Sequence, residues 1–371
     1  MDFAFSTDQD DLRIAARELL EHLCPVTDIA AAADAGRGFP PSWYAALAEQ
    51  GWPGLSIPEL FGGLGQSRLD EAVLFEEAGR ALLPGPFTTT VALGLPVLLA
   101  AAESGPATGL VADLLPLVAA GERTLTLAWA ESRHDDITVT DLSTAVVAGR
   151  LVGVKRYVPD LVSVTDVLVT VAGDDGLAVH LVSVGDLGVA VLPRSTSDTT
   201  RPLGELLLEG ADPAPLLRGV DARIALGLAR RRWLAAAACE AVGVGQACLD
   251  LALAHASTRQ QFGRVIGTYQ AVSHQIADSY SDLQLARSAA YWAAWSDATN
   301  DPGAEIAACS AMAVAGPAAV RIAERAIQVH GGMGMTWEHP LHRYYKRALG
   351  LVSLTGGTAV LREQVAAVLL G

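Results

Sequence analysis

The stretch TRQQFGRVIGTYQ, residues 258–270, joins two segments whose apolar spacing predicts long helices. Arg259 offers a planar, permanently charged guanidinium that suits a phosphate group. Phe262 adds an apolar ring, Gly263 favours a turn, and Gln270 both donates and accepts hydrogen bonds. An arginine that only caps a helix would give the same local pattern. The stretch therefore predicts a turn between helices and leaves anion binding as one of two explanations.

A second candidate stretch is QVHGGMGMTWEHPLHRYYKRA, residues 328–348. Its glycines predict a turn in which backbone amides can approach a ligand closely, with Gln328 beside them. Gly331 and Gly332 would also be expected simply to end a helix. Nothing local decides between these two explanations.

The segments around these stretches are helical. Apolar residues recur at the spacing of helices that pack in a bundle, and the positions are Val272, Ile276, Leu283, Ala286, Ala290, Ala293, Ala319, Ile322, Ala323, Ala326 and Ile327. Toward the N-terminus, Ser6 followed by Gln9 predicts an N-cap, and residues 51–65 form a Gly/Pro-rich loop. Between the helical parts the period changes to two, and Gly173–Gly176 predicts a hairpin.

The sequence thus predicts an α+β chain in three parts. They are an N-terminal helical domain (1–120), a central antiparallel β domain (121–215) and a C-terminal four-helix bundle (216–371). The net charge of −15 argues against nucleic acid or an anionic membrane as a partner, although a locally positive pocket can still bind a small anion. The longest apolar stretch, beginning at Val91, is broken by Pro96 and is too short to span a bilayer.

The four cysteines, Cys24, Cys239, Cys248 and Cys309, have no metal-ligand spacing. We expect them to be reduced core residues of a cytoplasmic protein without a metal site.

Taken together, the RxxFG…Q and QxxGGxG motifs, with EQGWPGLSIPELFGGLG (49–65), resemble the acyl-CoA dehydrogenase family over the whole chain. The resemblance implies FAD, with its pyrophosphate and adenosine half held across a dimer interface while the flavin ring lies in the neighbouring subunit. It assigns this role to Arg259, Gln261, Phe262, Gln270, Gln328, Gly331, Gly332 and Thr358. It also implies α,β-dehydrogenation of an acyl-CoA thioester, with a glutamate as base and an electron-transfer flavoprotein as acceptor.

This sequence departs from the family pattern at the base. The family's usual glutamate corresponds here to Gly356, in LTGGTAV, and the alternative position on the first long C-terminal helix corresponds to Trp233. The family's T-E-P-x-x-G-S-D motif is matched only by AESRHDD, from Ala130 to Asp136. Its second β motif is matched by Tyr157-Val158-Pro159, which keeps an aromatic residue.

Three functions remain open from these residues. The chain is expected to be the non-catalytic, FAD-clamping subunit of a heterotetramer whose homologous partner carries the glutamate, as in dehydrogenases for bulky sterol side-chain CoA esters. Alternatively it is a homo-oligomeric dehydrogenase with an atypical base, for which Glu131 and Glu338 are candidates, or a flavin-free scaffold of the same fold.

Several further residues have two possible roles. Arg223 and Arg230–Arg232 would either meet coenzyme A phosphates or, as we prefer, form a solvated helix face. His330, His339 and His342 are expected in loops or at an interface. Trp337, Tyr344 and Tyr345 are expected to pack in the fold or at an interface.

Overall fold

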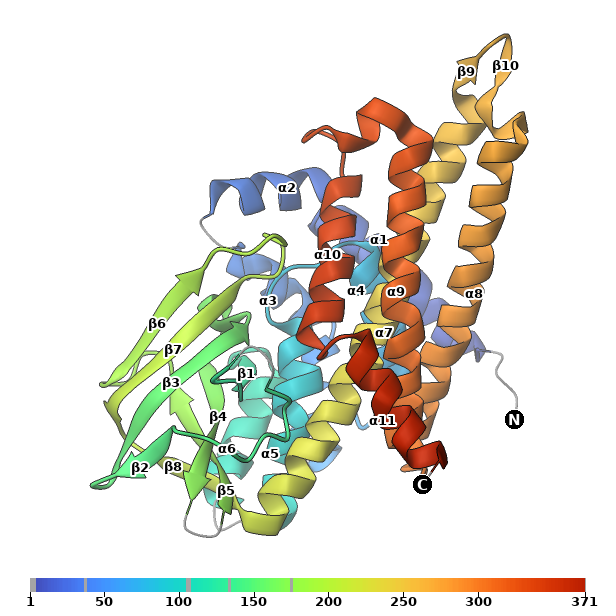
Figure 1. Cartoon of the computed structure of the whole chain (residues 1–371). Coiled ribbons are helices and arrows are strands. Elements are labelled where there is room, and N and C mark those ends of the chain that lie inside the picture. The colour runs from blue at the N-terminus through green and yellow to red at the C-terminus, as the bar shows by residue number, and fades with distance from the viewer. Residues whose placement is uncertain (1–4, 37–38, 105–107, 133–134, 174–175, 371) are drawn as a thin grey trace. The chain divides into compact units, whose positions relative to one another are not determined.

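The computed structural model describes residues 5–36, 39–104, 108–132, 135–173 and 176–370 (Figure 1). Contacts divide the chain into two compact units, and each is considered by itself. The first consists of Met1–Asp34, Arg68–Leu83 and Leu234–Gly371, and the second of Ala35–Ser67 and Pro84–Trp233. The three sequence-based boundaries remain a prediction, because this division groups N- and C-terminal helices together.

The first unit begins with α1 (Thr7–Leu23), followed by α2 (Val26–Ala35) and α4 (Arg68–Arg80). Ser6 and Gln9 form the predicted capping box, in which each side chain bonds the other's backbone N–H. Ala16 and Leu20 are the buried residues of α1. The N-cap inferred from the sequence is therefore confirmed.

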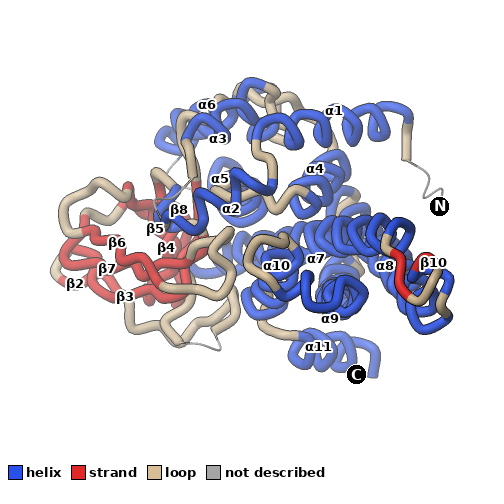
Figure 2. The backbone as a smooth tube through the Cα atoms, turned by 90° about the horizontal axis from the view of Figure 1, so that it is seen from above, coloured by secondary structure: helices blue, strands red, loops and turns tan. Residues whose placement is uncertain are grey.

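Five helices complete this unit. They are α7 (Gly219–Thr258), whose first residues belong to the second unit, α8 (Gln270–Ala298), α9 (Ala304–His330), α10 (Leu341–Leu354) and α11 (Thr358–Leu370). Seen along its axis, α9 lies among the other C-terminal helices (Figure 2). Its buried face is mostly alanine, as the spacing predicted, so neighbouring helices approach closely.

Helices α4 and α7 approach each other closely at two glycines. A Cβ on Gly79 would lie 2.1 Å from the backbone oxygen of Glu240, and one on Gly243 would lie 1.9 Å from that of Glu76. No other residue fits such a contact, because the neighbouring atoms are rigid backbone. These two glycines therefore bring the two helices together.

The second unit contains a sheet whose strands run in the order β6-β7-β3-β2-β4-β5-β8, with β1 beside β4. The strands are β1 (Leu125–Ala128), β2 (Ala145–Val147), β3 (Arg150–Pro159), β4 (Asp166–Gly173), β5 (Gly176–Ser183), β6 (Val189–Arg194), β7 (Leu203–Ala211) and β8 (Ala214–Arg218). Most pairs are antiparallel, but β1 and β2 run parallel to β4. Gly173 pairs with Gly176, which confirms the hairpin, although its two central residues lie outside the described part.

Helices of the second unit precede the sheet in the chain. They are α3 (Pro41–Glu49), α5 (Leu95–Ser104) and α6 (Thr108–Ala119), with a π-helical turn at Thr89–Gly94 and 3-10 turns at Trp52–Gly54 and Glu59–Phe61. The last two turns occupy the predicted Gly/Pro-rich loop. Thr90 Oγ1 accepts a hydrogen bond from the backbone N–H of Leu125 at 2.9 Å, which ties the π-helical turn to β1.

Two helical runs, Gly219–Thr258 and Ala304–Met335, are long and apolar enough to cross a bilayer by length and composition. In their most apolar windows, 83% and 67% of the residues are buried inside the protein. Core helices of soluble proteins meet the same criteria. The sequence-based remark that the longest apolar stretch begins at Val91 overlooked these runs, because their apolar character comes largely from alanine spread over many turns.

Candidate cofactor-binding site

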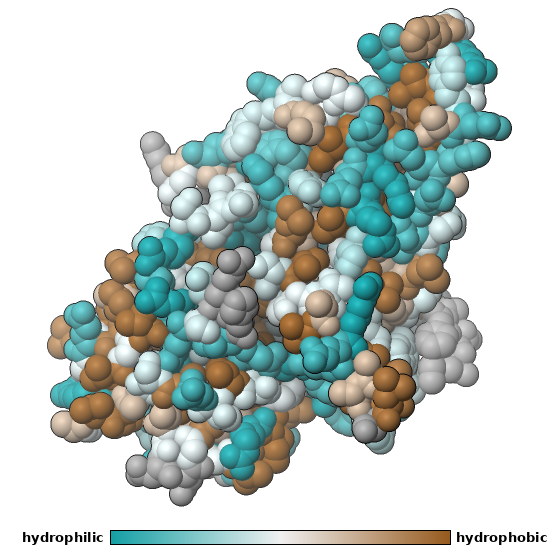
Figure 3. All heavy atoms as spheres, viewed as in Figure 1, coloured by the Kyte–Doolittle hydropathy of each residue, from teal (hydrophilic) through white to brown (hydrophobic). Residues whose placement is uncertain are grey.

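The stretch 258–270 forms a small hairpin between α7 and α8. Its strands are β9 (Gln260–Gln261) and β10 (Arg264–Val265), and Phe262 and Gly263 at the tip have φ angles of 53° and 80°. The side chain of Phe262 is 94% exposed, and the hairpin end carries apolar surface (Figure 3). A fully exposed ring on a fixed turn is typical of a contact to another molecule.

The hairpin is braced by two residues that the sequence reading did not single out. The guanidinium carbon of Arg264 lies 3.9 Å from the centroid of the Tyr269 ring, a cation–π contact. Tyr269 Oη donates to the backbone oxygen of Gln261 at 3.1 Å. In the sequence, only a charged and an aromatic residue flanking a turn pointed to these contacts. Such pairs are too common to predict that they stabilise a hairpin.

The second stretch begins at the end of α9. Gln328 is exposed, α9 ends at His330, and Gly331 has a φ of 61° before the 3-10 turn Gly331–Met335. A Cβ placed on Gly331 or Gly332 would meet nothing within 4 Å. The backbone at this turn is therefore not covered by other atoms of the chain, and its contact with a ligand remains a prediction.

The structure brings the two stretches to the same end of α7 and α9. The rings of His255 on α7 and His330 on α9 stack with centroids 4.3 Å apart. The backbone N–H of Arg259 donates to the oxygen of His255 at 2.9 Å, so Arg259 lies one turn beyond this stack. His330 is buried inside the helix end, so the expectation of a loop histidine is wrong there. His339 lies in a turn, and His342 lies in the first turn of α10.

Thr358 does not join this group within one chain. It begins α11, and Gln364 of that helix lies 3.6 Å from the Sγ of Cys309, near the opposite end of α9 from Gly331. Its assignment to the cofactor remains a prediction.

Neither position expected for the catalytic base carries a carboxylate. Gly356 is exposed between α10 and α11 with a φ of 87°, and a Cβ placed on it would meet nothing within 4 Å. Trp233 is 1% exposed and is the largest of the fully buried side chains. Its Nε1 has no hydrogen-bond partner among the described residues, and the guanidinium carbon of Arg201 lies 5.9 Å from its ring.

In the loop that matches the family's first β motif, the backbone donors of Glu131 and Ser132 are bonded within the loop. Asp135 Oδ2 accepts from the backbone N–H groups of Glu131 at 2.8 Å and Ser132 at 2.7 Å, and Asp135 Oδ1 accepts from the Ser132 hydroxyl at 2.5 Å. Burial alone would raise the pKa of Asp135, but these hydrogen bonds lower it below its ordinary value. An internal carboxylate therefore occupies donors that a ligand would otherwise use.

Glu131 is committed to a structural role. Lys155 Nζ, which is fully buried, lies 2.8 Å from Glu131 Oε1, and the backbone N–H groups of Ser143 and Thr144 donate to the same carboxylate. Burial raises its pKa, but Lys155 and these donors outweigh burial and hold the pKa at about 2. A carboxylate with so low a pKa is a poor general base near neutral pH.

Two other carboxylates, Glu338 and Glu240, differ in their surroundings. Glu338 is exposed in the turn before α10. Glu240, on α7, is buried and lies 2.6 Å from Arg347 Nη1, which is equally buried. The ion pair with Arg347 therefore occupies the Glu240 carboxylate.

The arginine run on α7 is not a solvated face. Arg230 and Arg232 are 6% and 5% exposed. Arg230 Nε lies 2.8 Å from Asp136 Oδ2, and Arg232 Nη2 donates to Ser56 Oγ at 2.8 Å. The preferred interpretation was wrong because α7 is buried on several faces, so charges there meet protein partners. Arg223 alone of the named arginines is exposed.

The aromatic residues after α9 have partners within the chain. Tyr344 is buried and donates to the backbone oxygen of Arg80 at 2.9 Å, and Tyr345 donates to Glu324 at 3.2 Å. Trp337 is 56% exposed, and its Nε1 donates to Asp34 at 3.0 Å. Packing within the fold therefore accounts for Tyr344.

The cysteines are not exposed to solvent in this structure. All four cysteines are buried, and burial raises the pKa of Cys24 to about 12, so its thiol is unreactive. In the part of the chain that the structure describes, no three His, Cys, Asp or Glu side chains are grouped so as to hold a metal ion.

Comparison with known proteins identifies the family. Residues 6–107 match the acyl-CoA dehydrogenase N-terminal domain model, and residues 219–370 match the C-terminal domain model. The acyl-CoA dehydrogenase IpdE2 of Mycobacterium tuberculosis is 31% identical, over 88% of this chain and 86% of the relative. FadE34 of the same organism is 33% identical, over 96% of this chain and 48% of the relative.

Solved structures also resemble this chain over nearly its whole length. The steroid ACAD Tcur3481-Tcur3483 is 28% identical with a TM-score of 0.86, and 98% of each chain is covered. The ChsE4-ChsE5 complex from Mycobacterium tuberculosis is 27% identical with the same TM-score, covering 100% of this chain and 99% of that one. Butyryl-CoA dehydrogenase from Megasphaera elsdenii, 21% identical with a TM-score of 0.90, shares the fold.

The residues at the end of α7 and α9 fit part of the family's cofactor. Arg259 is exposed and makes no ion pair within the described residues, so its guanidinium is available to a diphosphate. The open backbone at Gly331 and Gly332 and the exposed amides of Gln270 and Gln328 add neutral donors. The matching domain models and relatives show that the chain belongs to the acyl-CoA dehydrogenase family, whose members are FAD-dependent flavoproteins.

Proposed function

We propose that this chain is the non-catalytic, FAD-clamping subunit of a mixed acyl-CoA dehydrogenase oligomer, whose homologous partner supplies the base. One observation carries the proposal: the positions expected for the base hold Gly356 and the buried Trp233, while Arg259 and the Gly331 turn remain open to a ligand. A general base contributes about 10²–10⁴-fold to rate, so its loss would leave a homomeric enzyme feeble.

The loop 130–136 supports the same conclusion. In a subunit that used this loop to hold its own flavin, the amides of Glu131 and Ser132 would face the ligand. Here Asp135 accepts from both. The chain thus combines an open clamp with an internally satisfied loop, as expected for a subunit that lends one half-site and does not use the other.

In the proposed complex, FAD would supply the hydride-accepting chemistry of the family. This chain's residues would orient the cofactor and neutralise its charge. Arg259 would pair with the diphosphate, and Gln270 and Gln328 would donate and accept hydrogen bonds. Phe262 would insert between the two subunits. Each guanidinium–phosphate contact is a charge-assisted hydrogen bond, and such bonds are about twice as strong as neutral ones.

The relatives suggest the partner and the substrate class. One structural neighbour is a steroid ACAD, and another is a complex of two differently named chains. We infer that the partner is a second acyl-CoA dehydrogenase chain carrying the glutamate, and that the substrate is a CoA ester with a bulky, sterol-like acyl group. An electron-transfer flavoprotein is the proposed acceptor, and the cytoplasm the proposed location.

Co-expression tests this proposal. We expect the chain made alone to contain little FAD, and the complex with a glutamate-bearing homologue to contain about one FAD per pair of unlike chains. Native mass measurement and the flavin absorbance would establish both. A lone chain that is fully flavinated and oxidises an acyl-CoA would refute the proposal and favour a homo-oligomer with an atypical base.

Replacement of Arg259 by alanine separates the clamp from a flavin-free scaffold. We expect Arg259→Ala to lower the FAD content of the mixed complex at least tenfold. The matched control is Arg321→Ala, because Arg321 is also an exposed arginine of the C-terminal helices but pairs with Asp282 at 3.0 Å. Equal FAD in wild type and Arg259→Ala would favour the scaffold.

A further inference from the structure

Two adjoining cavities lie within the first unit, away from the residues of the FAD clamp. One has a volume of about 370 Å³ and the other about 420 Å³. Arg17, Arg80 and Asp250 line both cavities, so these three residues form their shared boundary. Cavities of this size are in the range that binds small molecules.

The first, which we call the apolar cavity, has a wall from the end of α1, the start of α2, the end of α4 and the middle of α7. Its apolar lining includes Leu20, Cys24, Pro25, Val26, Ala81 and Leu251. Charged residues also line it, and among them Glu77 is buried and pairs with Arg17. The apolar part of the wall suits a hydrocarbon group, whose burial is favourable.

The second, the arginine cavity, has the opposite character. Four guanidinium groups line it, from Arg13, Arg17, Arg80 and Arg287, against only two carboxylates, Glu76 and Asp250. Glu77 also pairs with Arg17, so the guanidinium groups exceed the carboxylates by one. A positive excess attracts an anion, and guanidinium groups match the geometry of carboxylates and phosphates.

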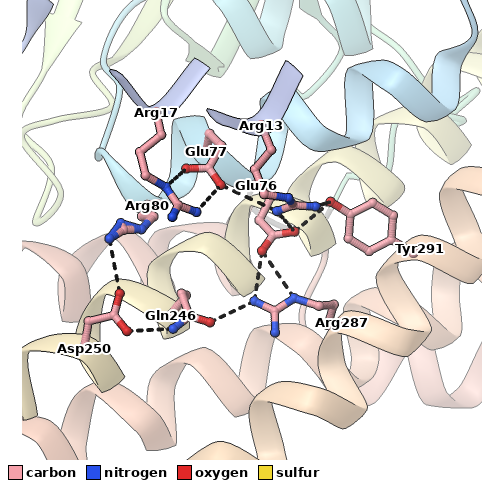
Figure 4. Close-up of polar contacts among 9 residues, drawn as sticks. All are labelled: Arg13, Arg17, Glu76, Glu77, Arg80, Gln246, Asp250, Arg287 and Tyr291. Carbon is pink, nitrogen blue, oxygen red and sulfur yellow. Dashed lines mark hydrogen bonds and ion pairs between the residues drawn. The ribbon is translucent and has the colours of Figure 1, made fainter. Parts of the chain in front are cut away.

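Most of these arginines already have partners (Figure 4). Arg287 Nη2 lies 2.9 Å and Arg13 Nη1 lies 3.1 Å from Glu76, and Arg17 Nη2 lies 2.8 Å from Glu77. The Tyr291 hydroxyl also donates to Glu76, at 2.7 Å. This part of the network is complete and stabilises the packing of α1, α4 and α8.

Arg80, at the boundary of the two cavities, is less well satisfied. Its only ion pair among the described residues is with Asp250, at 3.2 Å, and the Asp250 side chain is 41% exposed. The Nε of Arg80 is buried and has no hydrogen-bond partner among the described residues. Leaving a buried donor on a charged group unpaired is destabilising, so an additional acceptor here would stabilise the protein.

We propose that these cavities form a binding site for an apolar carboxylic acid, with its carboxylate at Arg80 and its hydrocarbon chain in the apolar cavity. The carboxylate supplies the acceptor that Arg80 Nε lacks, and it can bond a guanidinium in a bidentate manner. Asp250 remains held by Gln246 Nε2 at 2.7 Å when Arg80 turns to the ligand. A phosphate alone would use the arginine cavity but leave the apolar cavity unfilled.

Calorimetric titration of decanoate, decanol and inorganic phosphate into the full chain tests the proposal. We expect saturable binding of one decanoate, weaker binding of decanol and no measurable binding of phosphate. Arg80→Gln should weaken decanoate at least tenfold and leave decanol unchanged, whereas Ala81→Phe, which fills the apolar cavity, should weaken both. Arg321→Gln, the matched arginine control, should change neither.

Thermal unfolding of each variant separates loss of the site from loss of the fold. A further variant, Arg80→Lys, keeps the charge and should retain part of the decanoate affinity. The proposal is overturned if wild type shows no saturable decanoate binding, if Arg80→Gln binds decanoate as wild type does, or if phosphate binds and decanoate does not. FAD content is a separate readout, because no residue assigned to the clamp lines either cavity.

Discussion

Glu131 illustrates how the surroundings of one carboxylate decide its role. It occupies a loop next to the sheet, where an unfamiliar base was conceivable from the sequence, but Lys155, Ser143 and Thr144 surround its oxygens. Sequence spacing could not reveal these partners, because Lys155 lies 24 residues away on β3. The proximity follows from sheet pairing, which no local pattern encodes.

The pKa of Glu131 predicts an acid-sensitive contribution to stability. Its pKa in the folded protein is about 2, lower than the ordinary 4.5, so its contribution is complete above about pH 4.5 and is lost as the pH falls toward 2. We expect Glu131→Gln to lower the free energy of unfolding by about 2 kcal/mol at pH 7, after allowance for screening at a partly exposed site.

Urea unfolding of wild type and Glu131→Gln between pH 2 and about pH 7 would measure this difference. The gap between the two proteins should shrink as the pH falls. A gap that stays constant down to pH 2 would contradict the assigned ion pair with Lys155.

Trp233 makes a second prediction possible, because its large side chain is buried while its Nε1 lacks a partner among the described residues. Trp233→Phe removes an unsatisfied donor along with some volume, and these effects oppose each other. We expect it to change the free energy of unfolding by no more than about 1 kcal/mol, whereas Trp233→Ala should cost about 3–5 kcal/mol.

Chemical denaturation of the two variants decides the point. If Trp233→Phe were as costly as Trp233→Ala, the indole N–H would have a partner, such as an ordered water, that stabilises the fold. Neither variant is expected to change the FAD clamp, since Arg259 lies 26 residues further along the same chain.

Among the helices and strands, short-range sequence patterns predicted where elements begin and end better than they predicted what surrounds each residue in the fold. The capping box at Ser6, the hairpin at Gly173 and the helix stop at Gly331 each depend on neighbours within four residues, and the structure confirms all three. The burial of Arg230 and the parallel pairing of β1 with β4 depend on segments far away in the chain. Tertiary contacts of this kind leave no short-range pattern, so the sequence reading missed them.

The crossing of α4 and α7 yields a prediction about two glycines in one helix. A Cβ at Gly243 would lie 1.9 Å from the backbone oxygen of Glu76, whereas one at Gly227 would meet nothing within 4 Å. We therefore expect Gly243→Ala to destabilise the protein by about 1–3 kcal/mol or more through overpacking. Gly227→Ala should stabilise it by up to about 1 kcal/mol, because alanine is the better helix former.

Thermal or urea unfolding of the two matched variants provides the comparison. Because both positions lie in α7, helix propensity favours alanine at each, and only the contact with α4 differs. Equal effects at both sites would mean that α4 and α7 are not held at this separation.

For the complete molecule, family membership leaves two questions that must be treated separately: which chain holds FAD and which chain removes the proton. Gly356 bears only on the second, and a glutamate there would face a backbone φ of 87°, which costs a residue with a side chain about 1–2 kcal/mol. The loop at Asp135 bears on the first, because its carboxylate already accepts from the amides of Glu131 and Ser132.

This separation predicts that restoring the base alone does not create a self-sufficient enzyme. We expect the lone chain carrying Gly356→Glu to show no acyl-CoA oxidation and no gain in bound FAD, because the substitution adds a carboxylate without freeing the loop donors. Adding Asp135→Gly to that variant removes the internal acceptor and should raise the FAD content of the lone chain. Flavin absorbance after gel filtration and reduction of an artificial electron acceptor measure the two outcomes. If Gly356→Glu by itself gave a flavinated, active homo-oligomer, the missing base would be the chain's only defect, and the loop at Asp135 would have no part in excluding the flavin.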